Sequence, residues 1–121
     1  SSHEEISVKA SMKPIRNKFS WGTIEWLAND EVGNSRELSL ARMTLPPGGA
    51  TDTHIHANCE ESIYVVRGEV ECRIGEERVR VKAGGQSVVP KGAVHSIRNA
   101  GDAPAEIILS YSSAARAFEL V

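Results

Sequence analysis

The chain has 121 residues, of which 40% are hydrophobic and 25% are charged, and its formal net charge is −2. This length fits one domain over residues 1–121 and leaves little room for a second. The scattered basic residues argue against nucleic-acid and membrane-surface partners, and no apolar run approaches the ~20 residues that span a bilayer.

Short strands separated by turns dominate the expected structure. The 20 Val and Ile residues far outnumber the six Leu residues, and β-branched side chains pack well on a pleated sheet. Gly, Pro and Asn recur at short intervals as turn signals, which is typical of an all-β sandwich or barrel. In chain order we expect strands over 21–27, 37–45, 53–56, 62–67, 69–74, 78–82, 86–89, 93–98 and 106–111, then a short helix or an added strand over 113–120.

A first cluster of chemically active residues follows the pattern Gly48-x5-His54-x-His56-x4-Glu61-x6-Gly68. Residues i and i+2 of a strand point to the same face, so His54 and His56 present two imidazoles to one interior. Glu61 opens the next strand after a turn of four residues. That turn returns its carboxylate to the side of the two histidines.

A second pattern reads Gly84-x5-Pro90-x-Gly92-x2-His95-x3-Asn99. Its histidine, His95, can supply a third imidazole from across the barrel. Three neutral imidazoles and one carboxylate suit one divalent transition metal, namely Mn, Fe, Co, Ni, Cu or Zn.

Both patterns, at 48–68 and 84–99, resemble the two signature motifs of the cupin superfamily without a departure. The 15 residues between Gly68 and Gly84 resemble the short spacing of small single-domain microbial members. The resemblance implies a cupin-type jelly-roll β-barrel. It also implies that the metal ligands are His54, His56, Glu61 and His95.

Two neighbours compete with Glu61 for a place in this site. Glu60 also carries a carboxylate, but Glu61 shares a strand face with Ile63 and alone keeps the six-residue gap to Gly68, so Glu61 is favoured. Cys59 lies between His56 and Glu61, in a turn that we expect to aim its thiol away from the site; a role for it stays open.

The substrate pocket is expected to be mostly apolar, with Arg42 as a possible partner for an acidic substrate. Its predicted lining residues are Arg42, Ile63, Cys72 and Ile97. Arg98 lies on the opposite parity to His95 and is expected to point elsewhere. Core or dimer packing is favoured for Trp21 and Trp26 over a substrate platform.

Four protein ligands around a metal that accepts six leave up to two positions open, as in catalytic sites. The resemblance therefore implies a metal-dependent enzyme of the dioxygenase, isomerase, lyase or decarboxylase type, acting on a small organic substrate that coordinates the metal. The alternative is a non-enzymatic sensor module that binds a small molecule or a metal.

Resemblance and size also predict a homodimer, with the N-terminal segment 1–30, and within it residues 11–27, crossing onto a partner. The two cysteines are expected to be reduced thiols of a cytoplasmic protein.

Overall fold

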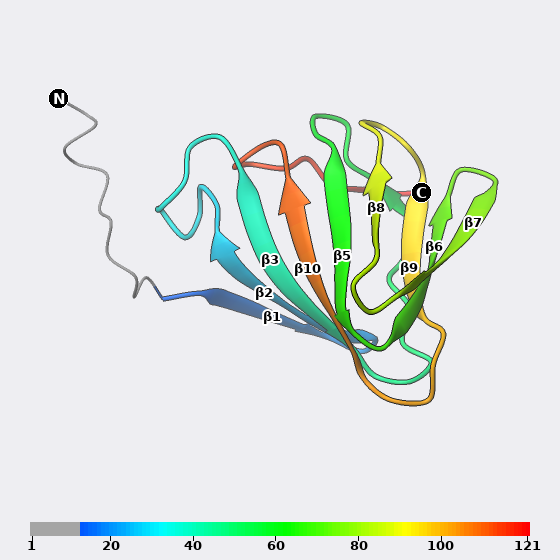
Figure 1. The fold of residues 1–121 in the computed structure, drawn as a ribbon. Coiled ribbons are helices and arrows are strands. Elements are labelled where there is room, and N and C mark those ends of the chain that lie inside the picture. The colour runs from blue at the N-terminus through cyan, green and yellow to red at the C-terminus, as the bar shows by residue number, and fades with distance from the viewer. Residues whose placement is uncertain (1–12) are drawn as a thin grey trace, which may run out of the picture.

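The computed structural model describes residues 13–121, which form two antiparallel sheets and no helix (Figure 1). The first sheet has the order β1 (Ile15–Phe19), β2 (Gly22–Ala28), β3 (Ser39–Leu45), β10 (Ala105–Tyr111), β5 (Glu61–Arg67) and β8 (Gln86–Val89). The second has the order β11 (Glu119–Leu120), β4 (His54–Ile55), β9 (His95–Asn99), β6 (Glu69–Ile74) and β7 (Glu77–Lys82). This arrangement confirms the all-β jelly-roll barrel. No helix that would suffice to cross a membrane occurs in this part of the chain.

The core lies between the two sheets and is built by alternation along the strands. In β3 every second residue from Ser39 to Leu45 is buried, and β10 repeats this pattern from Ala105 to Tyr111. Because successive side chains of a strand point to opposite faces, one face of each strand packs inside. Ile97 of β9 is 1% exposed and meets these strands from the second sheet.

Two short strands refine the sequence prediction. β1 was not predicted, and it pairs with β2 of its own chain from Ile15 opposite Trp26 to Phe19 opposite Gly22. The terminal stretch 113–120 ends in an added strand rather than a helix, because Leu120 pairs with His54. The C-terminal strand therefore lies beside the first histidine motif, whereas β1 forms an edge of the six-stranded sheet.

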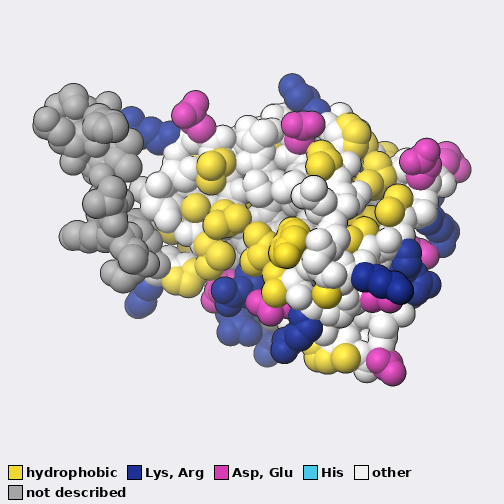
Figure 2. All heavy atoms as spheres, in the orientation of Figure 1, with side chains coloured by type: hydrophobic (Ala, Val, Ile, Leu, Met, Phe, Trp, Pro, Cys, Tyr) yellow, Lys and Arg dark blue, Asp and Glu magenta, His cyan; other side chains and the backbone are white. Residues whose placement is uncertain are grey.

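The N-terminal crossing onto a partner falls partly outside the described residues, since these begin at residue 13. Within the described residues, β1 is an edge strand that pairs with β2 of the same chain. A band of apolar side chains crosses the outer face of the six-stranded sheet, over β3, β10 and β5, with charged side chains along its border (Figure 2). Its exposed members in β5 are Tyr64 and Val66, at 44% and 43% exposure, and Val88 of the adjacent β8 continues it at 52% exposure.

Gly68 joins the two sheets at the point where β5 passes into β6. Its φ is +87°, in the left-handed region that favours glycine. A Cβ atom there would lie 2.9 Å from the Cα of Ala105 and 3.2 Å from the carbonyl oxygen of Pro104, so the backbone of the loop before β10 fills the space. Gly75, in the turn between β6 and β7, has φ +61° but open space around it.

We expect Gly68→Ala to destabilise the fold more than the matched variant Gly75→Ala. Both carry left-handed strain of about 1–2 kcal/mol, but only Gly68→Ala adds a backbone collision, which costs about 1–3 kcal/mol further. Urea unfolding of both variants measures the difference. Equal free energies of unfolding would contradict the close approach of Gly68 to the β10 loop.

Candidate metal site

Three strands bring the four predicted ligands to one place. His54 lies in β4 opposite His95 of β9, and Glu61 is the first residue of β5. His56 follows β4 by one residue. One ligand atom from each of the four residues lies within 4.8 Å of all the others, and all four residues are buried. The two sequence motifs thus meet inside the barrel.

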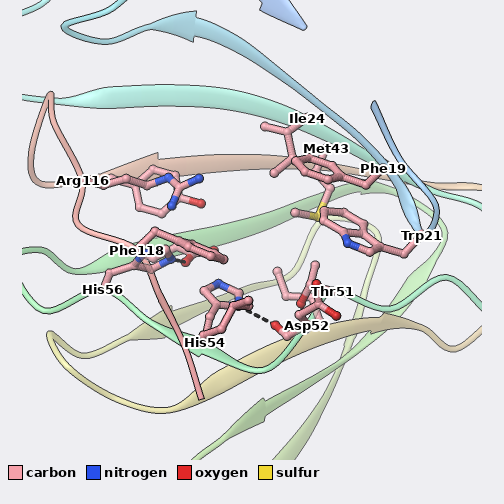
Figure 3. Close-up of a pocket in the computed structure, with 14 residues that line it drawn as sticks. Phe19, Trp21, Ile24, Met43, Thr51, Asp52, His54, His56, Arg116 and Phe118 are labelled. Atoms are coloured by element: carbon pink, nitrogen blue, oxygen red, sulfur yellow. Dashed lines mark hydrogen bonds and ion pairs between the residues drawn. The ribbon is translucent and has the colours of Figure 1, made fainter. Parts of the chain in front are cut away.

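A backbone carbonyl holds each imidazole in place through its Nδ1 atom. The partners are Asp52 for His54, Ala117 for His56 at 2.8 Å, and Ala93 for His95 at 3.0 Å; the bond to Asp52 is drawn in Figure 3. A carbonyl oxygen can only accept, so each Nδ1 must carry the hydrogen. In the neutral rings Nε2 is then left with a lone pair, which is the form that binds a metal.

Glu61 faces two of these Nε2 atoms with a single oxygen. Its Oε1 lies 2.9 Å from Nε2 of His95 and 3.1 Å from Nε2 of His56. Lone pairs of neutral rings would repel this oxygen, so a proton or a cation has to lie between them. The buried Nε2 of His56 also lacks a hydrogen bond of acceptable geometry. An orphaned buried nitrogen beside a carboxylate fits a divalent ion held by these four residues.

The ionisation of His54 and Glu61 also favours a metal. Burial lowers the pKa of His54 to about 4, so this ring is neutral at neutral pH. Burial would raise the pKa of Glu61, but its close contacts with His56 and His95 outweigh burial and lower the pKa to about 2. Burial alone would lower the pKa of His95, but the hydrogen bond and charge of Glu61 raise it, so a metal ion at this ring has to displace a proton. A neutral imidazole and an ionised carboxylate are the forms that metals bind.

A cavity of about 450 Å³ adjoins the site, and three of the four ligands, His54, His56 and Glu61, line it (Figure 3). Its other walls are mostly apolar. Phe19 and Trp21 stack with ring centroids 4.7 Å apart and planes 4° apart. Other lining residues include Ile24, Met43, Ile97, Tyr111 and Phe118. The metal site therefore opens to a space that a small molecule can enter.

Of the four residues predicted to line the pocket, only Ile97 does so. Ile63 and Cys72 are fully buried in the core instead. The prediction that Arg42 lines the pocket is wrong, because its side chain lies on the outward-facing side of β3. On the outer face it lies 3.6 Å from Glu25 and 3.4 Å from Glu106.

The competing residues near Glu61 do not enter the ligand set. Glu60 is exposed, and its backbone nitrogen donates a hydrogen bond to Ser112 Oγ. Cys59 and Cys72 are both free and buried. Burial raises the pKa of the Cys59 thiol, and it raises that of Cys72 to about 12. Thiols held protonated in this way are poor nucleophiles and poor metal ligands.

Several residues of the cavity were missed or misplaced by the sequence reasoning. Tyr111 lies opposite Glu61, with its ring 5.2 Å from that of His56, and the alternation of β10 could have placed it inside. Phe118 stacks on His54 at 4.9 Å, and no sequence periodicity signals it. Trp26 is buried in the core as favoured, whereas Trp21 lines the cavity.

Comparison with known proteins agrees with this geometry. Residues 41–111 match the family model described as a cupin domain. The chain belongs to the cupin superfamily. Among curated relatives, nectarin-1 of Nicotiana langsdorffii x Nicotiana sanderae is 32% identical over 90% of this chain and 51% of its own length. Germin-like protein subfamily 2 member 2 of Arabidopsis thaliana is 33% identical over 66% of this chain and 39% of its own. The chain thus spans about half the length of the curated relatives, or less.

Solved structures show the same fold. An oxalate decarboxylase of Lactobacillus farciminis in complex with formate superposes with a TM-score of 0.82 over 89% of this chain and 33% of that chain, at 23% identity. An oxalate decarboxylase of Bacillus subtilis at pH 4.6 gives a TM-score of 0.81 at 20% identity, covering 88% and 29%. At this level of identity the likeness establishes the cupin barrel and not the reaction.

We expect His56→Ala to lose the metal and keep the barrel, because the core is strand packing and His56 follows β4 rather than building it. Metal affinity should fall at least about 100-fold, since even the outer partners of metal ligands are typically worth 10–100-fold. Elemental analysis and thermal unfolding measure the two properties. The matched control, Glu60→Gln, removes a carboxylate only one residue from Glu61 and should retain one ion per chain.

A His56→Ala variant that binds metal as tightly as the wild-type chain would contradict the assigned ligand set. A variant that no longer folds would make the site structural.

Proposed function

We propose that this cupin is a metal-dependent enzyme that acts on a small organic molecule which coordinates the metal. The observation that carries the proposal is the position of the ligands. His54, His56 and Glu61 line a cavity large enough for a substrate, whereas a purely structural site is closed by protein on all sides.

The ion is one divalent transition metal, and Mn(II) is the first to test among Mn, Fe, Co, Ni, Cu and Zn. The oxalate decarboxylase of Bacillus subtilis, which shares this fold, has Mn(II) centres. Three imidazoles and one carboxylate would hold such an ion. When bound, it would supply a Lewis acid with open coordination positions, and electron transfer if it is redox-active.

The residues of the chain prepare the site for that chemistry. The carbonyls of Asp52, Ala117 and Ala93 fix the orientation of the three rings. Burial, followed by the charge of Glu61, raises the pKa of Tyr111 well above its usual value, so its phenol stays a hydrogen-bond donor. Phe118 and the stacked Phe19 and Trp21 give the space in front of the ligands an apolar wall.

The reaction class is tested by turnover. Protein loaded with Mn(II) or Fe(II) is assayed for oxygen uptake with a 1,2-diketone and a flavonol, and for release of carbon dioxide from oxalate. We expect metal-dependent turnover of about 1 s⁻¹ or more with one of these substrates. Turnover should be abolished by a chelator and restored by the metal, and His56→Ala should be inactive.

Tight binding of these compounds without turnover would instead establish the sensor module. Binding that is unchanged in metal-free protein would reject coordination to the metal as the basis of recognition.

The expected homodimer remains a proposal, and the apolar band on the outer face of the six-stranded sheet supports it. Exposed Tyr64, Val66 and Val88 gain from burial against a second copy. Sedimentation should give twice the chain mass of 13.1 kDa. Val88→Glu should give the monomer, whereas Arg78→Glu, on exposed β7, should leave the dimer intact. A wild-type monomer would contradict the proposal.

The cytoplasmic location stays a prediction.

A further inference from the structure

Arg116 enters the cavity from the segment between β10 and β11. Its guanidinium carbon lies 4.7 Å from the ring centre of Trp26, 5.4 Å from that of Tyr111 and 5.1 Å from that of Phe118. Contacts with three aromatic faces hold a cation in a defined place. Within residues 13–121, Arg116 is the one arginine or lysine that lines the cavity beside the metal ligands (Figure 3).

Arg116 combines a place in the cavity with a buried Nε and no acidic partner. Four surface arginines pair with glutamates at 4.0 Å or less, namely Arg42, Arg78, Arg80 and Arg98. Among the described residues, no carboxylate lies within that distance of Arg116, and its buried Nε makes no hydrogen bond. A buried donor without an acceptor is costly to the protein on its own.

The unpaired cation is close to the metal ligands. The ring of Phe118 contacts the guanidinium group on one side, and its centre lies 4.9 Å from that of His54 and 6.0 Å from that of His56. Tyr111 likewise lies between the cation and a metal ligand, because its ring contacts both Arg116 and His56. A molecule that coordinates an ion at the histidines therefore needs to extend past only one aromatic ring to reach Arg116.

We infer that Arg116 is the anion-binding residue of this cavity, and that it takes the carboxylate of a substrate whose other end coordinates the metal. This inference rests on the proposed function for the metal end. Guanidinium and carboxylate groups match in a two-point hydrogen bond, and the pairing gives the cation of Arg116 the anionic partner that it lacks. The apolar walls at Trp21, Ile24 and Met43 suit a hydrocarbon or aromatic body. The substrate class is thus a small organic acid with an apolar body and a separate metal-binding group.

The test uses two probes of similar size that differ in one group, a charged carboxylate or a neutral amide. 3,4-Dihydroxybenzoate carries a catechol for the metal and a carboxylate for Arg116, and 3,4-dihydroxybenzamide replaces the carboxylate with a neutral amide. Calorimetric titration of the Mn(II)-loaded protein without oxygen should give at least tenfold tighter binding of the acid, which corresponds to about 1.4 kcal/mol. Arg116→Met keeps an apolar chain of similar length against the aromatic rings and should abolish this preference. It should leave the affinity for the amide within about twofold to threefold.

Arg116→Lys keeps the charge and should retain part of the preference for the acid. Metal content and thermal unfolding of both variants serve as folding controls. An Arg116→Met variant that still prefers the acid tenfold, or a wild-type chain without that preference, would overturn the inference. Failure of the proposed function has a different signature, namely binding of the amide that a chelator does not reduce.

Discussion

Each of the three imidazole rings has its Nδ1 hydrogen committed to a backbone carbonyl, and this commitment decides the chemistry of the site. The opposite nitrogens of His56 and His95 then face the same buried oxygen of Glu61 at 3.1 and 2.9 Å. Three lone pairs and a negative charge cannot share a buried space without a positive charge among them. The four ligand atoms would repel one another without a cation, and a divalent ion bound among them stabilises their arrangement.

The C-terminal segment links this metal site to the cavity beside it. The carbonyl of Ala117 orients His56, while Phe118 covers His54. Asn58, in the loop between β4 and β5, forms hydrogen bonds with both Ala115 and Ala117, and β11 pairs with β4. Ligand orientation, the aromatic wall and the cation of the cavity therefore depend on one stretch of backbone. A change in this stretch would alter the specificity of the site and its metal affinity together.

Most of the barrel and the ligand set could be predicted because they depend on local rules. Alternation of side chains placed strands such as Ser39–Leu45, and two spaced motifs placed the histidines. β1 was missed because its sequence, IRNKF, has few apolar residues and gains stability only by pairing with β2. Arg42 was misassigned because its side chain faces outward. Arg116 and Phe118 reach the site through tertiary contacts of an irregular segment, which no period in the sequence marks.

X-ray absorption spectroscopy at the edge of a metal bound to the purified protein identifies the atoms that surround the ion. We expect one ion per chain with three imidazole ligands and one carboxylate oxygen, and open positions filled by exchangeable solvent. A first shell of oxygen alone, or one with fewer than three imidazoles, would contradict the convergence of His54, His56, Glu61 and His95 on a single ion.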